Sequence, residues 1–160
     1  MTWTTCDLAD THGDDARVLP LTLRHYGGSR RFTGPVTTVK CFEDNSRVKD
    51  LVETPGDGRV LVVDAGGSTR YALLGDNLAG TAQQNGWAGI VIHGCVRDTA
   101  ALASLPLGIM AVGSTPRRSL KNGEGQIGIP IEIGPVHCVS GDVLFADDDG
   151  AILIADSLLG

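Results

Sequence analysis

Three short apolar runs, separated by segments with a helical pattern, constrain the fold of this chain more than any other feature. They are RVLVVDA at residues 59–65, GIVIHG at 89–94 and GIMAVG at 108–113. A continuous apolar run of this length, bounded by turn residues, is typical of a strand that is buried on both faces. Such strands occur in sheets covered by helices, so the chain is predicted to be an α/β sandwich with a sheet at its centre and helices outside.

The segments around these runs complete the predicted architecture. Helices are expected at residues 42–53, 75–86 and 98–105, and a short helix with an arm within 1–20. Further strands are expected at 34–42 and 69–75, followed by three or four short antiparallel strands within 129–155. No repeat or linker divides the chain, and its length suits one hydrophobic core. Residues 1–160 are therefore predicted to form a single domain.

The composition argues against several kinds of partner. Thirteen basic and nineteen acidic residues give a net charge of −6, and the basic residues form only short pairs such as Arg117-Arg118. A nucleic-acid partner is therefore not expected, and no apolar stretch is long enough to suggest a membrane span. The four cysteines match neither a zinc ribbon nor a redox pair, and no signal peptide is recognised. These features predict reduced thiols in a cytoplasmic protein.

Other candidate sites are explained better by ordinary structure. Gly66-Gly67 predicts a hairpin turn, because the GxGxxG pattern of a dinucleotide site is absent. The acidic segment 147–150 also predicts a hairpin turn, because it lacks the alternating ligands of a calcium loop. His93 and Cys95 would share one face of a strand, and Lys40 could form a Schiff base. A buried thiol and an exposed, ion-pairing lysine are the favoured interpretations.

The segment GDNLAGTAQQNGWAGIVIHGCVRD, residues 75–98, places polar groups at both ends of one helix–strand unit. Gly75-Asp76-Asn77 stands where a strand enters a helix, and Arg97-Asp98 follows the next strand. Because the carboxyl ends of neighbouring parallel strands meet at one edge of a sheet, these groups could converge on a pocket. Asp76, Asn77 and Asp98 could equally be helix N-caps, with Arg97 as a surface partner. The pattern alone leaves both interpretations open.

The chemistry of such a pocket can be stated. The free amides of residues 76–78 and the Arg97 guanidinium suit the planar oxygens of a 2-oxo acid. Asp98, together with water, could hold Mg²⁺ or Mn²⁺. The cation and Arg97 would then stabilise an enolate, while Asp76 could position or deprotonate a water.

Several segments, spread over nearly the whole chain, resemble one family. They are CDLAD, HYGGSRRFTGPVTTVKCFEDN, RVLVVDAGGSTRYALLGDNLA, NGWAGIVIHGCVRD and SGDVLFADDDGAILI. On these segments the chain resembles the family of the regulator of ribonuclease activity A and the related class II 4-hydroxy-4-methyl-2-oxoglutarate aldolases. The resemblance implies a compact α/β/α sandwich of the swivelling-domain type with a central mixed sheet. It also implies a homotrimer with sites between its subunits.

The resemblance further implies roles for individual residues. Family members competent as aldolases carry an Asp, twenty residues, and then Arg-Asp, which here are Asp76, Arg97 and Asp98. By resemblance, Arg97 and the amides from Gly75 to Leu78 bind the pyruvyl substrate. Asp98 carries the Mg²⁺ or Mn²⁺, often through water, and Asp76 orders a water for proton transfer. The implied lyase cleaves 4-hydroxy-4-methyl-2-oxoglutarate into two pyruvates and decarboxylates oxaloacetate through the same pyruvate enolate.

Two other functions compete with this one. Some family members are regulators that bind and inhibit an endoribonuclease of the RNase E type, but a pure regulator does not need the pair Arg97-Asp98. A methyltransferase of menaquinone synthesis is disfavoured because the sequence lacks a glycine-rich cofactor loop. One departure concerns the end of the chain at Gly160. Longer aldolases of the group have a C-terminal segment that supplies an acidic residue to the neighbouring subunit's site, and no clear counterpart is recognised here.

Overall fold

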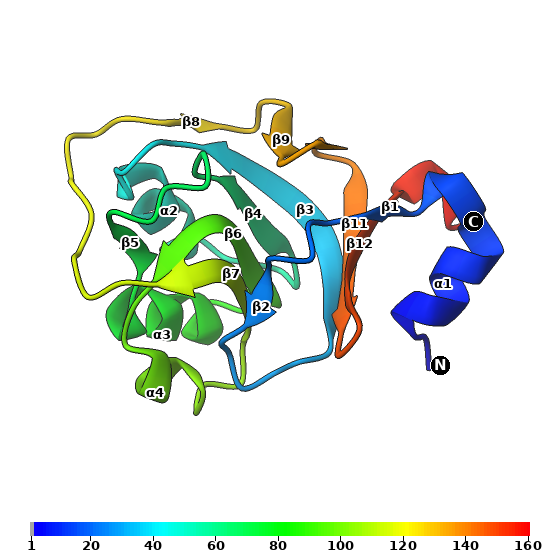
Figure 1. The fold of residues 1–160 in the computed structure, drawn as a ribbon, viewed down its shortest axis with the longest axis horizontal. Helices are drawn as coiled ribbons and strands as arrows, with labels where there is room; N and C mark the ends of the chain where they lie inside the picture. The colour runs from blue at the N-terminus through cyan, green and yellow to red at the C-terminus, as the bar shows by residue number, and fades with distance from the viewer. Residues whose placement is uncertain (1) are drawn as a thin grey trace.

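A computed structural model describes residues 2–160 and shows one long, curled mixed sheet (Figure 1). Its main path runs β1-β12-β11-β3-β4-β6-β7-β2, while β5 pairs with β6, β8 pairs with β3, and β9 and β10 form a separate ribbon. The strands are β1 (Arg17–Val18), β2 (Arg24–His25), β3 (Phe32–Lys40), β4 (Val60–Asp64), β5 (Ala72–Leu74), β6 (Gly89–Val96), β7 (Gly108–Ser114), β8 (Gln126–Ile127), β9 (Ile131–Ile133), β10 (Val136–Cys138), β11 (Asp142–Asp147) and β12 (Gly150–Ala155). The helices are α1 (Thr5–His12), α2 (Ser46–Val52), α3 (Asp76–Gln84) and α4 (Thr99–Leu102), with 3₁₀ turns η1 (Gly13–Asp15) and η2 (Asp156–Leu158).

The three apolar runs form the parallel centre of the sheet. They are the strands β4, β6 and β7, and β3 joins them in parallel beside β4. The remaining pairs along the main path are antiparallel. The predicted mixed α/β fold is therefore confirmed. Within residues 2–160, no helix combines the length and the apolar character needed to cross a membrane.

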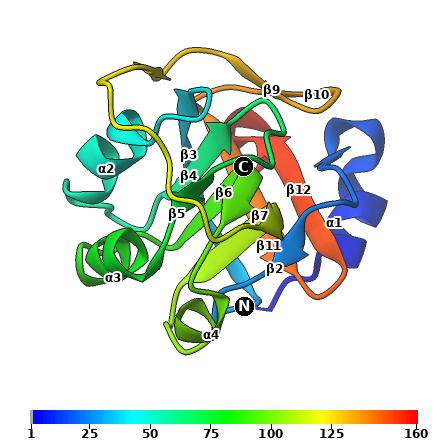
Figure 2. The same cartoon turned by 60° about the vertical axis from the view of Figure 1, so that its left-hand side comes forward.

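The two faces of the parallel strands are covered in different ways. Leu61 and Ile92 belong to the core under α2, α3 and α4, whereas Val62 and Val91 belong to the core on the opposite face. The sheet itself covers that second face, because β11 and β12 curl over it and contribute Leu144 among other side chains. In Figure 2, α2, α3 and α4 lie on one side of the sheet, and β12 and α1 lie on the other. The second helical layer is thus α1 alone, which packs outside β11 and β12 rather than on the parallel strands.

Of the two turns predicted as hairpins, one is a hairpin and one is not. Asp147 pairs with Gly150, so β11 and β12 are joined by a tight hairpin as expected. Gly66 and Gly67 have φ values of 66° and 71°, which fits a glycine turn. However, β5 after this turn pairs in parallel with β6 rather than with β4, so the hairpin prediction is wrong. The Gly67 N–H donates to the carbonyl of His93, 2.9 Å away, which anchors the turn on β6.

Phe32, at the start of β3, lies against two glycines that pair across β6 and β7. Gly89 and Gly108 are register partners, and a Cβ at Gly89 would lie 2.5 Å from the Phe32 ring. A Cβ at Gly108 would overlap the same ring. Phe32 is only 6% exposed and belongs to the core on the β11–β12 side of the sheet. The absence of side chains at these two positions therefore makes room for one large aromatic ring.

Replacing Gly108 with alanine is expected to destabilise the protein. The added methyl group overpacks the core, so the free energy of unfolding should fall by about 1–3 kcal/mol. The control is Gly80→Ala in α3, because a Cβ there meets nothing within 4 Å. That change should raise the free energy of unfolding by about 0.5–1 kcal/mol through helix propensity. Urea unfolding of both variants measures this, and equal stability of the two would contradict the packing described for Phe32.

Candidate functional site

The two ends of the segment 75–98 lie side by side in the structure. β5 and β6 are parallel, with Leu74 paired to Val96, and the Arg97 N–H donates to the carbonyl of Leu74 at 2.9 Å. Each strand then turns directly into a helix, β5 into α3 and β6 through Asp98 into α4. The structure thus brings together the residues whose convergence the sequence suggested.

Asp98 caps the neighbouring helix rather than its own. It precedes α4 in a left-handed conformation, with φ 57° and ψ 43°, and its side chain makes no capping bond to that helix. Instead its Oδ2 accepts the backbone N–H of Asp76 at 3.0 Å, at the start of α3. The Asp76 amide is therefore engaged, contrary to the expectation that it would be free. The amides of Asn77 and Leu78 remain, because the first turn of a helix has no carbonyls to accept them.

Gly75 is required for this close approach. It is the N-cap residue of α3, and a Cβ at this position would lie 2.6 Å from Asp98 Oδ2 and 3.3 Å from Arg97 Nε. Its φ of −128° is open to any residue, so the constraint is steric and not conformational. A side chain at this position would displace the Asp98 carboxylate or the Arg97 guanidinium from the start of the helix.

Arg97 is held loosely at the same place. Its Nε lies 4.0 Å from Asp98 Oδ2, and its Nη1 donates to the carbonyl of Pro116 at 3.4 Å. The side chains of Arg97 and Asp98 are 36% and 39% exposed. Both interactions are long, so most donors of the guanidinium are free to bind an incoming anion.

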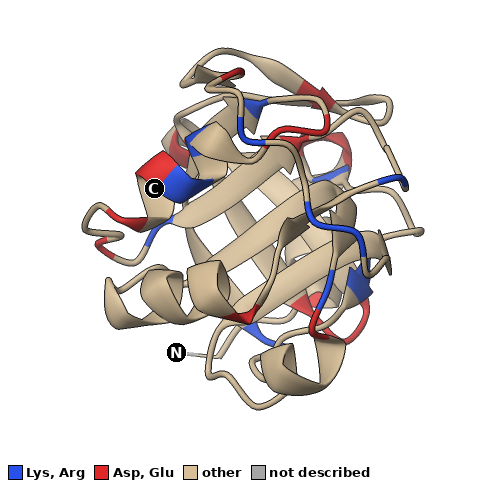
Figure 3. Ribbon diagram, turned by 90° about the vertical axis from the view of Figure 1, so that its left-hand side faces the viewer, with Lys and Arg blue, Asp and Glu red and all other residues tan. Residues whose placement is uncertain are grey.

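A pocket of about 280 Å³ opens at this point of the sheet edge. Its lining contains four cationic side chains and one carboxylate, which are Lys49, Arg97, Arg118, Lys121 and Asp76. The protein as a whole carries a net charge of −6, so this positive character is local. Figure 3 faces the side of the molecule from which α2, α3 and α4 project, and shows basic segments on the loop that crosses in front of the sheet. The pocket is suited to an anionic ligand.

Sequence reasoning missed the part of the pocket contributed by other segments. Lys49 comes from α2, and Arg118 and Lys121 come from the loop after β7. Backbone bonds dock this loop on β5, since the Ala72 N–H donates to the Arg117 carbonyl at 2.7 Å and Ser119 N–H donates to the Ala72 carbonyl at 3.1 Å. The only signal in the sequence was the basic pair 117–118, which does not reveal what the loop packs against.

Asp44 fixes the other side of the loop. Its carboxylate accepts the Ser46 N–H at 2.9 Å at the start of α2, and the Asn122 N–H at 2.6 Å. Burial raises the pKa of this carboxyl, but the hydrogen bonds from residues 46 and 122 outweigh burial and lower the pKa below its usual value. An ionised Asp44 therefore ties α2 to the loop.

Asn45 places a buried, unsatisfied acceptor in the pocket wall. The residue is 6% exposed, and its Nδ2 donates to the carbonyl of Leu73 at 3.1 Å. Among the residues that the structure describes, nothing donates to its Oδ1. A buried carbonyl oxygen without a donor is costly, so this position leaves one hydrogen-bond acceptor unsatisfied in the wall.

The carboxylate oxygens at this site suit a divalent cation such as Mg²⁺. Over residues 2–160, no group of three or more His, Cys, Asp or Glu side chains is placed to hold a metal. Mg²⁺ needs no such group, because it binds through one or two carboxylates and keeps water or substrate oxygens as its other ligands. Asp98 offers its second oxygen, Oδ1, and lies beside Asp76.

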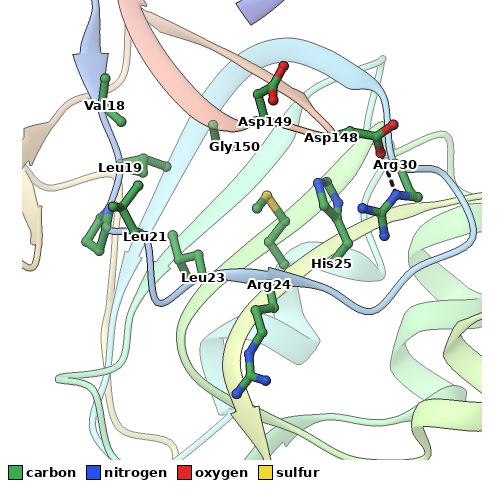
Figure 4. A pocket seen from close by; sticks show the side chains of 13 residues that line it. Val18, Leu19, Leu21, Leu23, Arg24, His25, Arg30, Asp148, Asp149 and Gly150 are labelled. Atoms are coloured by element: carbon green, nitrogen blue, oxygen red, sulfur yellow. Dashed lines mark hydrogen bonds and ion pairs between the residues drawn. The ribbon is translucent and has the colours of Figure 1, made fainter.

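A larger pocket, of about 400 Å³, lies elsewhere, between the β1–β2 segment and the β11–β12 turn (Figure 4). Its walls include Leu19, Leu23 and Met110, and its charges are balanced because Arg30 pairs with Asp148 at 2.5 Å. A hollow in which two arginines, Arg24 and Arg30, face two aspartates, Asp148 and Asp149, has no net charge to favour an anion. The smaller, positive pocket is therefore the candidate site.

The Cys95 thiol is not placed to act as a nucleophile. It is 1% exposed, and burial raises its pKa, so the reactive thiolate is scarce. The structure records no hydrogen bond between the side chains of His93 and Cys95. The interpretation of Cys95 as a buried structural thiol is consistent with this placement.

Comparison with known proteins identifies relatives along the full chain. A family model described as RraA-like, Aldolase/RraA, matches residues 5–153. A protein of Xanthomonas campestris pv. campestris strain B100, which carries the provisional name 4-hydroxy-4-methyl-2-oxoglutarate aldolase, is 50% identical over 158 residues, covering 99% of this chain and 95% of the relative.

Two solved structures are also very similar. One is the RNA-processing inhibitor RraA from Thermus thermophilis, with a TM-score of 0.93, 44% identity, and 97% of this chain and 94% of that chain covered. The other is titled S-adenosylmethionine:2-dimethylmenaquinone methyltransferase from Geobacillus kaustophilus, with a TM-score of 0.93, 44% identity, and coverage of 96% and 95%. The family model spans most of the chain, and these relatives match it nearly end to end. The chain therefore belongs to the RraA-like family.

Proposed function

We propose that this protein is a divalent-metal-dependent lyase that cleaves 4-hydroxy-4-methyl-2-oxoglutarate into two molecules of pyruvate. The observation that carries the proposal is the meeting of Arg97 and the start of α3 at one positively charged pocket, with the Asp98 carboxylate bound to the Asp76 amide beside it. The name of the Xanthomonas relative, at 50% identity, supports the same substrate. Oxaloacetate decarboxylation is the expected side activity, because it passes through the same pyruvate enolate.

The pyruvyl end of the substrate binds at the start of α3. Its carboxylate accepts hydrogen bonds from the amides of Asn77 and Leu78, where the helix dipole also favours negative charge. Arg97 donates to the 2-oxo oxygen and, because it is fixed in charge, stabilises the negative charge that develops there.

Cleavage transfers one proton and breaks one carbon–carbon bond. The C4 hydroxyl loses its proton to a water held by Asp76, a C4 carbonyl forms, and the electrons of the C3–C4 bond enter the enolate of the pyruvyl half. Return of a proton to C3 gives the second pyruvate, so no other reactant is consumed. Asp76 is exposed at the pocket and is its one lining carboxylate, which suits it for exchanging a proton with water.

A divalent cation held at Asp98 would supply Lewis-acid stabilisation of the enolate oxygen. The residues that position this carboxylate are part of the chain itself. Gly75 leaves space for Asp98, and the Asp76 amide fixes one of its oxygens. The other oxygen accepts no hydrogen bond from the described residues, so it would be available to a cation.

The first test is pyruvate release from 4-hydroxy-4-methyl-2-oxoglutarate and from oxaloacetate. Added Mg²⁺ or Mn²⁺ should support turnover of both substrates, and EDTA should abolish it, because the proposed enolate needs the cation. A coupled lactate dehydrogenase assay measures the pyruvate, with metal and substrate but no protein as the control. Turnover no faster than that control would refute the lyase.

Replacing Arg97 with alanine tests the centre of the site. Loss of a donor that faces the developing enolate should lower kcat/KM at least about 30-fold, which corresponds to about 2 kcal/mol. Arg117→Ala is the control, since this exposed neighbour of Arg118 does not line the pocket. An Arg97→Ala enzyme with unchanged kcat/KM would remove Arg97 from the mechanism.

The second candidate function is regulation of an endoribonuclease. It is favoured by the Thermus structure, whose title describes an RNA-processing inhibitor and which is 44% identical to this chain. A regulator of this kind should form a stable complex with an RNase E-type enzyme, and EDTA should not disrupt the complex. A pull-down with purified ribonuclease, in the presence and absence of EDTA, tests for it. Failure of the complex to form would leave the lyase as the single proposal.

A further inference from the structure

Residues 117–123, named the strap here, cross from β5 to the start of α2 in the loop after β7 (Figure 2). Two of the cations that line the candidate pocket, Arg118 and Lys121, belong to this segment. In the part of the chain that the structure describes, no acidic side chain forms an ion pair with either of them. Their charges are therefore placed at the pocket by whatever holds the backbone of the strap.

The first end of the strap is held by backbone bonds alone. The Ala72 N–H donates to the Arg117 carbonyl at 2.7 Å, and the Ser119 N–H donates to the Ala72 carbonyl at 3.1 Å. Arg118, between them, forms a parallel bridge with Ala72. No side chain takes part in these bonds, so this attachment does not depend on the chemistry of any one residue.

The second end of the strap is held by side chains at the start of α2. The Asp44 Oδ2 accepts the Asn122 N–H at 2.6 Å, and the Ser46 Oγ accepts the Gly123 N–H at 2.9 Å. The other oxygen of Asp44, Oδ1, accepts the Ser46 N–H at 2.9 Å. One carboxylate thus joins the first residue of α2 to the strap.

Lys121 lies between two of these attachment points. Leu120, before it, donates its N–H to the carbonyl of Glu43 at 3.0 Å, and Asn122, after it, is bound to Asp44. A lysine carries its charge on a flexible four-carbon stem, so the charge is no better placed than the backbone beneath it. Fixing the residues on both sides keeps this ammonium group near the pocket.

The Asp44 carboxylate is a stronger attachment than the neutral hydroxyl of Ser46. Asp44 is 1% exposed, and burial favours its neutral acid. The hydrogen bonds from residues 46 and 122 nevertheless lower the pKa of Asp44 below its usual value, so it is ionised at neutral pH. A hydrogen bond to an ionised acceptor is roughly twice as strong as one between neutral groups.

We propose that Asp44 is a positioning residue for the candidate pocket, because it holds the strap against α2 so that Arg118 and Lys121 present their charges to an anionic ligand. The inference rests on the proposed function and gives Asp44 a part in binding the substrate. Asp44 touches neither the substrate nor the reacting atoms, and it acts through the strap.

The groups proposed for the chemical step are held independently of the strap. The Arg97 N–H donates to the Leu74 carbonyl, and Asp98 is bound to the Asp76 amide. Loss of the Asp44 carboxylate should therefore weaken the binding of an anion and leave bond cleavage in the bound complex nearly unchanged. This combination separates a positioning role from a general role in stability.

Trypsin tests the strap without relying on turnover, because it cleaves after Arg117, Arg118 and Lys121. Cleavage of a native protein requires local opening, and its rate follows the population of the open form. Asp44→Asn places an NH₂ group against one of two backbone N–H groups that need an acceptor. Cleavage within the strap, identified by mass spectrometry, should be at least about tenfold faster than in the wild-type protein.

Two further variants make the test specific. Ser46→Ala removes only the acceptor of the Gly123 N–H and should accelerate cleavage less, and it also tests the strap if Asp44→Asn does not fold. Asp57→Asn is the matched control, since it makes the same change of charge at an exposed residue of the turn before β4 and should be cleaved like the wild type. Urea unfolding of each variant separates local opening from a loss of global stability.

Steady-state kinetics with oxaloacetate and Mg²⁺ tests the consequence for the pocket. Asp44→Asn should raise KM at least about fivefold, because the cations of the strap are less well placed, and should keep kcat within about twofold. A merely structural role would reduce the fraction of active protein, and would therefore lower kcat without changing KM. Asp57→Asn should keep both constants.

Each outcome bears on one part of the inference. Wild-type cleavage of the strap in both Asp44→Asn and Ser46→Ala would overturn the attachment. Faster cleavage with an unchanged KM, or with a lower kcat alone, would overturn the positioning role. If the wild-type protein releases no pyruvate, the lyase is refuted, and calorimetry with oxalate and Mg²⁺ takes the place of KM. Binding of oxalate at least about fivefold weaker in Asp44→Asn would then support the positioning role, and equal binding would overturn it.

Discussion

One hydrogen bond joins the two halves of the candidate site, from the Asp76 amide to the carboxylate of Asp98. It links the helix that follows β5 to the turn that follows β6, and it forms because Gly75 has no side chain to block it. Arg97, next to Asp98, is brought to the same pocket by this arrangement. Without this contact the two units would still be joined by the bond from the Arg97 N–H to the Leu74 carbonyl, but the Asp98 carboxylate would no longer be bound to the start of α3.

The sequence predicted those parts of the site that directly follow strands in the chain. Continuous apolar runs predicted β4, β6 and β7, and parallel pairing then placed Asp76, Arg97 and Asp98 at one edge. Asn45, Lys49 and Arg118 were missed because they reach the pocket from segments far away in the chain, and no local pattern encodes such docking. The same limit applies to β5, where the turn chemistry at Gly66-Gly67 was recognised but the choice of β6 as partner depends on tertiary contacts.

The site also shows how an acidic protein can present a cationic pocket. The overall charge is −6, yet four basic side chains gather on one hollow because α2, the β6 end and the loop after β7 converge there. Asp44 contributes indirectly, since its buried carboxylate accepts hydrogen bonds from backbone amides of α2 and of the loop. The Asp44 carboxylate thereby belongs to the frame of the pocket, and Asp76 is the one carboxylate that lines it.

Asp98 has a left-handed backbone, and one substitution at this position could separate its role in the fold from its proposed role in binding a cation. Asparagine adopts this conformation about as readily as aspartate, and its side-chain oxygen can accept the same amide hydrogen. An Asp-to-Asn exchange would therefore preserve the turn, the cap and the shape of the pocket while removing the charge that a cation needs. If Asp98 holds the proposed cation, one side chain decides whether this backbone can serve the lyase, while the backbone itself would remain available for a binding role.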